Sequence, residues 1–300
     1  MVLASGPDVY RRVLLVSLLV GAIGCSSSSS SPAENNDSGT TSDAPSPMPE
    51  AAPPQDGGGA SDAPSEASAS CAGYAYCDDF ESYSGPVTNG QMLGPWAASV
   101  MGATMSVDSI MPYQGSKALH ILVTAGTTAH GTLSQQASGG LVPGNNVYGR
   151  AMVYFATAGD AGTPMGVHSW LFNATGNSST ADGGVTMNVG GGGSPTKMQI
   201  NYHPPAPLTE KSAQGGMMMS PGAWHCVQWE YDGSGTTPAD DAKLWVDGTL
   251  AVEAKPSDGW NFATPWSAFD FGFTHYQTLA DGVDVFLDDF ALAGTMVPCP

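Results

Sequence analysis

The chain of 300 residues carries 27 acidic side chains against 8 lysines and arginines, which gives a formal net charge of -19 at pH 7. Phosphate recognition requires a basic face, so this balance excludes a nucleic-acid-binding protein. An anionic polymer would also be repelled unless a local cation or a bound metal intervened.

The first 24 residues have the pattern of a bacterial lipoprotein signal peptide. Arg11 and Arg12 form a basic region, and the apolar run Val13–Val20 that follows is too short to span a membrane. Cys25 stands where a lipobox places its acylated cysteine, although Ala22 replaces the more common leucine. We therefore expect lipid chains on Cys25 to anchor the protein at the bacterial outer membrane or cell surface, outside the cytoplasm. A plain secretory signal with an incidental cysteine is the alternative.

The segment 25–70 is predicted to be a tether. After the cysteine it is rich in Ser, Pro, Ala, Gly, Asp and Glu, and it has no aromatic residue, lysine or arginine. Such a composition cannot bury enough apolar surface to offset chain entropy. The remaining segment, 71–300, contains all seven tryptophans and is expected to form one all-β domain.

Short β-rich runs broken by Gly, Pro, Asn and Asp fill this domain, and sustained helical periodicity is absent from its sequence. The clearest predicted strands are Ala118–Val123, Val147–Phe155, Gly166–Phe172, Val185–Val189, Lys197–Tyr202, Trp224–Tyr231, Ala242–Val246, Phe269–Thr274 and Val283–Ala293. Asp247-Gly248 predicts a tight hairpin turn. The pattern indicates an antiparallel sandwich or jelly roll.

Five motifs in order resemble the core domain of fungal cellulose-induced proteins. They are CDDFES, YQGSKALHI, VYGRAMVYF, WHCVQWEYDG with KLWVDG, and DVFLDDFALAGTMVPC, and together they extend over residues 77 to 299. That family is a concanavalin A-like β-jelly roll related to glucuronan lyases. The resemblance implies a two-sheet antiparallel sandwich in a secreted protein linked to polysaccharides.

Paired aspartates followed by phenylalanine stand at both ends of the domain, in CDDFES and in LDDFAL. We expect these to be the first and last strands of one sheet, paired side by side. Asp78, Asp79 and Asp289 are then expected to be solvated residues at strand ends. Glu81 and Asp288 would meet and repel each other, and a calcium ion would remove that repulsion.

The resemblance extends this hypothesis to a set of calcium ligands. It implies that Glu81 and Asp288 bind calcium together with oxygens in the turn at Gln114 and Lys117. This chain departs from the family at Lys117, where only the backbone oxygen could serve as a ligand. The ion would be structural.

Four cysteines in an exported domain predict two disulfide bonds. Spacing alone does not choose among the three possible pairings. The resemblance favours Cys226–Cys299, which leaves Cys71–Cys77. Pairing of the terminal strands keeps Cys71–Cys299 with Cys77–Cys226 as an alternative.

The departures from the family bear on catalysis. The related proteins carry a His-x-Arg-x-Gly-Gly-Gln run on a central strand, and the matching stretch Thr186–Gly192 keeps only its glycines. Polar residues on this and neighbouring strands form the candidate glycan groove: Arg150, His168, Asn188, Gln199, Asn201, Tyr202 and His203. Glu230 and Asp232 have the spacing of a glycosidase pair, but the place of a third acid is taken by Ser234.

A surface-tethered carbohydrate-binding protein is therefore the leading hypothesis, with a polysaccharide as ligand and the membrane contacted only through the lipid anchor. One alternative is a polysaccharide lyase in which Arg150 acts with Tyr202 or His203 as catalytic residues. Another is a structural envelope lipoprotein without a glycan ligand. A monomer is expected in each case.

Overall fold

The structure is a computed structural model whose described part lies within residues 71–300. Inside that range it leaves out residues 137–141, 143–144, 157–168, 177–185, 193–196, 204–208, 218, 234–240, 256–264 and 277–281, and it describes only the backbone of residues 136, 186–192 and 197. The predicted signal peptide, acylation site and tether therefore lie outside the described residues, and so does His168. No helix that could cross a membrane was found in the described part of the chain.

Sheet A has the strand order β15-β14-β13-β8-β17-β6-β5-β2, and β1 pairs with β17 beside this path. Its strands are β1 (Tyr76–Asp78), β2 (Gly85–Val87), β5 (Ala103–Asp108), β6 (Ala118–Val123), β8 (Asn146–Phe155), β13 (Trp224–Asp232), β14 (Asp241–Val246), β15 (Thr249–Ala254) and β17 (Val283–Ala293).

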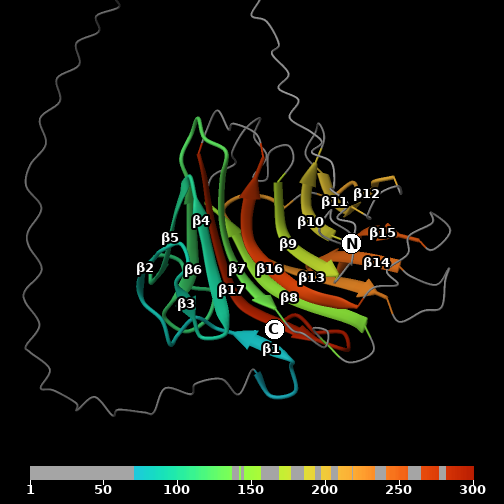
Figure 1. Ribbon diagram of the computed structural model, residues 1–300, viewed down its shortest axis with the longest axis horizontal. Coiled ribbons are helices and arrows are strands. Elements are labelled where there is room, and N and C mark those ends of the chain that lie inside the picture. The colour runs from blue at the N-terminus through green and yellow to red at the C-terminus, as the bar shows by residue number, and fades with distance from the viewer. Residues whose placement is uncertain are drawn as a thin grey trace, which may run out of the picture. The chain divides into compact units, whose positions relative to one another are not determined.

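Sheet B has the order β12-β11-β10-β9-β16-β7-β4-β3. Its strands are β3 (Met92–Leu93), β4 (Trp96–Met101), β7 (Ala129–Gln136), β9 (Ser169–Gly176), β10 (Thr186–Gly192), β11 (Lys197–His203), β12 (Lys211–Gln214) and β16 (Trp266–His275). Neighbouring strands pair antiparallel, and the two sheets stack as layers (Figure 1). The predicted all-β, two-sheet sandwich is confirmed.

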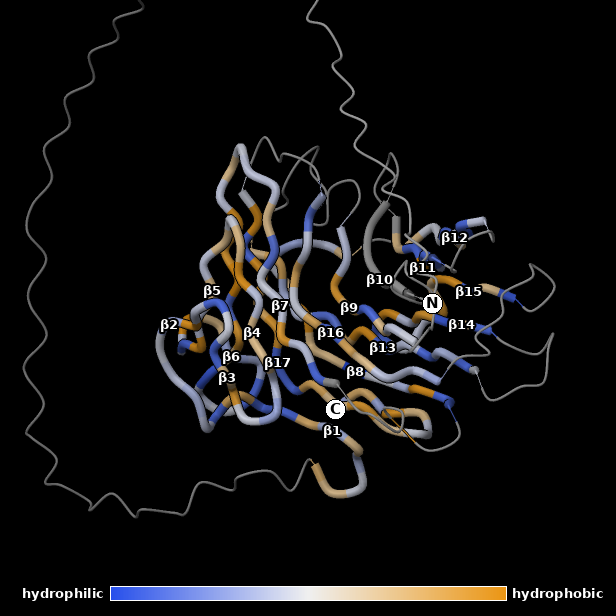
Figure 2. Tube along the Cα trace, viewed as in Figure 1, coloured by the Kyte–Doolittle hydropathy of each residue, from blue (hydrophilic) through white to orange (hydrophobic). Residues whose placement is uncertain are grey.

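The core lies between the two sheets and is rich in aromatic rings. Trp229 of sheet A stacks on Phe172 of sheet B with ring centroids 4.0 Å apart. Gly149 lies directly under this indole, because a Cβ atom there would come within 2.0 Å of a Trp229 ring carbon. Hydrophobic and hydrophilic residues alternate along many strands (Figure 2), as expected when one face of each strand packs inward.

The predicted strands all have counterparts, and two of them, β6 and β17, have the predicted bounds. Three long strands were not among the predictions: β4, β5 and β7. Their sequences WAASVM, ATMSVD and AHGTLSQQ are dominated by small and hydroxyl residues. The apolar alternation on these strands is short and mixed with alanine, since their core positions are filled by Trp96, Ala98, Met105, Val107, Ala129 and Leu133.

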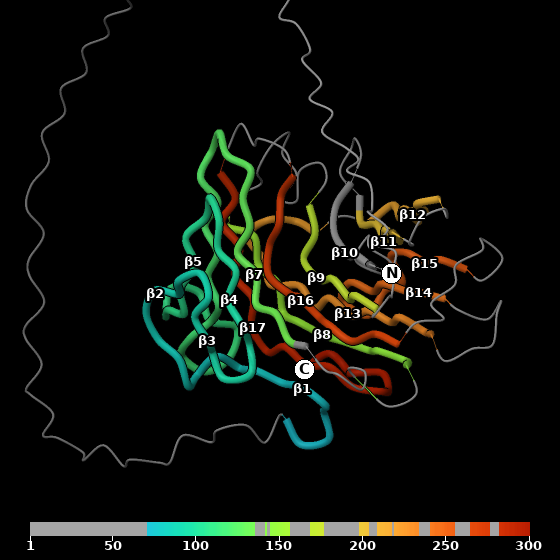
Figure 3. The backbone as a smooth tube through the Cα atoms, in the orientation of Figure 1, coloured from blue at the N-terminus to red at the C-terminus, as the bar shows by residue number. Residues whose placement is uncertain are grey.

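The two terminal strands lie side by side as predicted, with Asp78 opposite Phe290 (Figure 3). The prediction of solvated aspartates is wrong for two of the three. Asp78 is only 7% exposed and accepts a hydrogen bond from the indole N–H of Trp96 at 2.8 Å. Asp289 is 6% exposed and pairs with Arg150. A β-bulge between Asp288 and Ala291 turns the second pair of aspartates away from solvent.

Both disulfides favoured by the resemblance are present. Cys71 is bonded to Cys77 and Cys226 to Cys299, so the alternative pairing is wrong. The second bond fastens the C-terminal residues to β13 of sheet A. The side chain of Gln228 adds a hydrogen bond of 2.6 Å to the carbonyl oxygen of Val297.

Candidate functional site

The structure divides the residues of the predicted glycan groove between two sheets. Arg150 is on β8 of sheet A, where it is 4% exposed. Its guanidinium lies 2.6 Å from Asp289 Oδ1 and donates at 2.9 Å to the carbonyl oxygen of Pro298. These contacts hold the C-terminal segment against sheet A, and Arg150 does not join the candidates of sheet B.

The candidates on β11 belong to both faces of sheet B. Gln199, Asn201 and His203 share one face, since the strand continues to His203. Tyr202 faces the opposite way, is 2% exposed and belongs to the hydrophobic core. Its ring therefore does not line the same face as its polar neighbours.

A row of polar side chains crosses sheet B, and we call it the polar row. Its members are Ser134 on β7, Asp270 on β16, Asn173 on β9, Asn188 on β10, Asn201 on β11 and Ser212 on β12, each opposite the next in the strand register. Chain neighbours such as Leu133, Phe269 and Ile200 belong to the core, so the row lies on the outer face of sheet B. Asn188 is placed there by its backbone register.

Asp270 fixes the hydrogen bonding at one end of this row. One carboxylate oxygen accepts from the hydroxyl of Ser134, and the other accepts from Asn173 Nδ2 at 2.8 Å. Because the amide nitrogen of Asn173 is directed at the carboxylate, its Oδ1 is the atom left to face elsewhere. Asn173 Oδ1 and Asn201 Oδ1 are both buried and have no hydrogen-bond partner in the part of the chain that the structure describes. Such a group costs about 1–3 kcal/mol, so an unfilled acceptor in a native fold calls for an explanation.

A second row lies farther along the same outer face. Trp170 pairs with Thr274, which in turn pairs with His130 on β7. The hydroxyl of Thr274 is buried, with no partner among the residues described. The Trp170 indole donates a hydrogen bond of 2.8 Å to the hydroxyl of Tyr276, whose side chain is 61% exposed. An exposed aromatic ring held in place by a hydrogen bond offers a flat surface for stacking.

Sequence reasoning missed most of these residues. It identified Gln199, Asn201 and Asn188. It did not identify Asn173, Asp270, Trp170 or Tyr276. A signal existed in TMNVG and SWLFNATG, where asparagines interrupt apolar strands. Only the strand order shows that they lie opposite one another.

The residues predicted as calcium ligands gather around one turn, but N–H groups face the carboxylates. Glu81 Oε1 accepts from the backbone N–H groups of Ser116 (2.7 Å) and Lys117 (2.8 Å). Asp288 Oδ2 accepts from the N–H group of Gln114 at 3.2 Å. The Lys117 ammonium lies 2.7 Å from the carbonyl oxygen of Glu81. Calcium requires six to eight converging oxygens, so these groups as they lie do not fit the ion, and calcium stays a prediction to be tested.

The same contacts set the charge of the two carboxyls. Burial opposes ionisation of Glu81, but hydrogen bonds from Ser116 and Lys117 outweigh it and lower its pKa. At Asp288 burial prevails over the backbone hydrogen bonds and raises the pKa to about 7. Backbone N–H groups and Lys117 therefore stabilise the charge of Glu81, whereas the charge of Asp288 is only partly offset.

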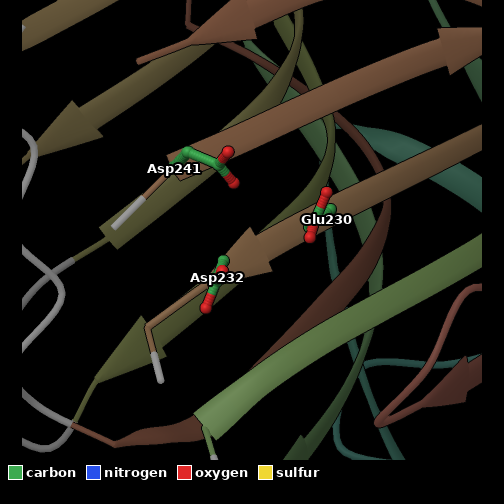
Figure 4. Close-up of side chains that lie close together, drawn as sticks. All are labelled: Glu230, Asp232 and Asp241. Carbon is green, nitrogen blue, oxygen red and sulfur yellow. The ribbon is translucent and has the colours of Figure 1, made fainter. Parts of the chain in front are cut away.

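A different group of carboxylates lies on the outer face of sheet A (Figure 4). Glu230, Asp232 and Asp241 offer oxygens within 4.8 Å of one another and could hold a metal ion. The Lys243 ammonium already contacts two of them, at 3.2 Å from Glu230 and 2.6 Å from Asp241. Burial and the Glu230 carboxylate raise the pKa of Tyr148, which donates to Glu230, to about 12. The cluster thus contains an internal cation, and it lies on the sheet opposite to the polar row.

His225 stands between Asp247 (2.8 Å) and the hydroxyl of Ser220 (3.2 Å), in the order of a hydrolase triad. Its Nε2 also lies 3.0 Å from the carbonyl oxygen of Ser220, which can only accept. Nε2 is thus shared between the carbonyl oxygen and the hydroxyl of one serine and is not aimed at the hydroxyl alone. The arrangement is therefore a hydrogen-bonded turn rather than a nucleophilic site.

The two antiparallel sheets with adjacent terminal strands define a concanavalin A-like jelly roll. Among solved structures, the cellulose-induced protein Cip1 is similar, with a TM-score of 0.52, 20% identity, and coverage of 75% of this chain and 100% of that one. The endo-β-1,4-glucuronan lyase of the fungus Trichoderma reesei is also similar, with a TM-score of 0.51, 15% identity, and coverage of 69% and 94%. The alginate lyase vAL-1 from Chlorella virus follows at a TM-score of 0.48 and 12% identity, covering 66% and 93%. No family model and no curated protein matches the sequence. The first two likenesses establish the fold, which is the one that the five sequence motifs implied.

Proposed function

We propose that this protein binds a polysaccharide on the outer face of sheet B. The observation that carries the proposal is the polar row, in which Asp270 orients Asn173 and the amide oxygens Asn173 Oδ1 and Asn201 Oδ1 have no hydrogen-bond partner among the described residues. Sugar hydroxyls can pair with the carboxylate, amide and hydroxyl groups of such a row, and Tyr276 supplies an exposed ring for a sugar face. The two similar structures, a cellulose-induced protein and a glucuronan lyase, support the same class of ligand.

The cellular setting is part of the proposal. Cys25 would carry the lipid anchor and residues 26–70 would hold the domain away from the membrane, at the outer membrane or cell surface. The composition of the tether and the lipobox-like stretch support this arrangement. The domain would then meet polymers outside the cell as a monomer.

Binding is favoured over lyase activity by the placement of the candidate catalytic groups. A lyase needs a cation or amide near the uronate carboxylate and a base near the proton to be removed. Arg150 is buried on the other sheet and Tyr202 is in the core. His203 remains on the correct face, with Nδ1 3.5 Å from Glu210. Calcium is not part of the proposal, because the carboxylates expected to bind it are satisfied by N–H groups.

The test uses the full chain with Cys25→Ser, which removes the predicted acylation site. A glycan array identifies ligands, and calorimetry measures affinity for the wild type and for Asn201→Leu. We expect Asn201→Leu to weaken binding at least tenfold while its melting temperature stays equal or rises, because it removes a buried amide oxygen that has no partner among the described residues. Glu253→Gln, on β15 of the other sheet, is the control and should bind as the wild type does.

The proposal fails if no glycan binds, or if Asn201→Leu binds like the wild type. Lyase activity is measured separately on glucuronan and alginate by the ultraviolet absorbance of the unsaturated uronate. We expect none above background. An ordinary enzymatic rate would establish the lyase alternative instead.

A further inference from the structure

Strand β16 runs through the middle of sheet B and connects two groups of residues on its outer face (Figure 1). Asp270 belongs to the polar row, and Tyr276 follows directly after the last residue of the strand. Six residues along a strand correspond to about 20 Å. Between these two positions Gly272 has no side chain and Thr274 is only 7% exposed. The side chains of β16 therefore leave the surface between the two groups open.

The ring of Tyr276 is exposed and yet held in one orientation. Its side chain is 61% exposed, while its hydroxyl accepts a hydrogen bond of 2.8 Å from the indole N–H of Trp170 on β9. Trp170 is 9% exposed, so packing fixes the donor. A ring that is already ordered loses little conformational entropy when a ligand stacks on it.

The surface beside Tyr276 combines polar and apolar groups. His130 on β7 pairs with Thr274, and its Nε2 lies 3.0 Å from the hydroxyl of Ser99. Met101 stands opposite His130 and is 55% exposed. A sugar presents apolar C–H groups on its faces and hydroxyl groups at its edges, so it can use both kinds of contact. This composition, on the same face as the polar row, favours a sugar unit over an apolar side chain of a protein partner.

We infer that the glycan lies along β16, with one sugar stacked on Tyr276 and others at the polar row. The inference rests on the proposed function and adds that the ligand is a stretch of polymer several sugars long. A disaccharide is too short to reach both groups, whereas a longer chain contacts them together. Two contacts made by one molecule strengthen binding beyond either contact alone. Trp170 is the positioning residue for the ring.

Oligosaccharides of increasing length test this arrangement. Two series are used, β-1,4-linked glucose and β-1,4-linked glucuronate, each with two, four and six units. The protein is the full chain with Cys25→Ser, and calorimetry measures the affinities. We expect the hexamer of at least one series to bind at least tenfold more tightly than its dimer, and Tyr276→Ala to remove this gain. Leu250→Ala removes another exposed apolar side chain, on β15 of sheet A, and should leave the gain unchanged.

Variants at Trp170 distinguish positioning of the ring from a general effect on folding. Trp170→Phe removes the hydrogen bond to Tyr276 but keeps an aromatic ring in β9, and we expect it to weaken hexamer binding about threefold. Combined with Tyr276→Ala, the same change should have no further effect, because Trp170 acts only through the tyrosine ring. Losses of equal size with and without Tyr276 would overturn the positioning role.

The outcomes separate the inference from the proposed function. Equal affinities for dimer and hexamer, or a gain that persists in Tyr276→Ala, would overturn the extended site. If Asn201→Leu still weakens binding in that case, the polysaccharide site at the polar row stands. If neither series binds, the inference fails, whereas the proposed function fails only if the glycan array also finds no ligand.

Discussion

Replacing Arg150 by methionine tests the structural role that the fold gives this residue. Its side chain is 5% exposed, and its partner Asp289 is 9% exposed. Arg150→Met keeps most of the stem but removes three hydrogen bonds, two to Asp289 and one to the carbonyl oxygen of Pro298. Removing one member of a buried pair leaves an uncompensated charge and costs about 3–5 kcal/mol. For a domain of this size that corresponds to a fall in melting temperature of roughly 6–20 °C.

The loss of folding stability in Arg150→Met should depend on pH in a defined direction. Burial raises the pKa of Asp289, and the Arg150 charge opposes that rise. Without Arg150 the folded-state pKa of Asp289 rises further, so the carboxyl becomes neutral sooner as the pH falls. The stability deficit of Arg150→Met should therefore be largest at neutral pH and shrink in acid.

Denaturant unfolding measures the free energy of unfolding and its dependence on pH. It is applied to the wild type, to Arg150→Met and to the double variant Arg150→Met/Asp289→Asn. Asparagine tolerates the positive φ of 47° at position 289, so the double variant should recover at least half of the lost free energy. Glycan binding measured well below the melting temperature should not change, because Arg150 lies on sheet A. A loss under about 1 kcal/mol in Arg150→Met, or no recovery in the double variant, would refute this account.

Three further predictions follow from contacts elsewhere in the sandwich. Gly149→Ala should destabilise the fold by about 3 kcal/mol, seen as a lower denaturation midpoint, because its Cβ would overlap the Trp229 ring; a midpoint within error of the wild type would contradict the core packing. Burial opposes protonation of His120, but its hydrogen bonds to Asp284 and Asp108 outweigh this and raise its pKa. The stabilisation from His120 should therefore be complete below about pH 6.5 and be lost as the pH rises through the raised pKa, so His120→Asn should cost most in acid and least in alkali; a constant cost would disprove the pairing. Chelation should leave the melting temperature unchanged, because N–H groups already satisfy the carboxylates predicted to bind calcium; a drop that excess calcium reverses would restore the metal site.

Several features of the fold could be read from local pattern. Strands such as Ala118–Val123 combine β-branched and apolar residues between turn signals, so their place in the chain is visible without the partner strand. Asp247 and Gly248 both adopt positive φ, as the predicted hairpin turn requires. The disulfides followed from the resemblance, since four cysteines alone allow three pairings.

The candidate site was only partly accessible to such reasoning. Gln199 and Asn201 share a face because alternation along one strand is a local property. Arg150 and Tyr202 were placed with them incorrectly. A strand sequence shows which residues alternate, but it does not show which of the two faces turns toward the core or which sheet receives the strand.

The sequence by itself therefore determined the class of fold, the periodicity of its strands and the acidic balance that excludes nucleic acid. Tertiary structure decided everything that depends on neighbours across the sheets. Asp78 and Asp289 are buried rather than solvated because of the strands that pack on them. Asn173 and Asp270 are 97 residues apart in the chain, and they form one hydrogen-bonded row only because β9 and β16 pair. Contacts of this kind arise from strand order, which short-range propensities do not encode.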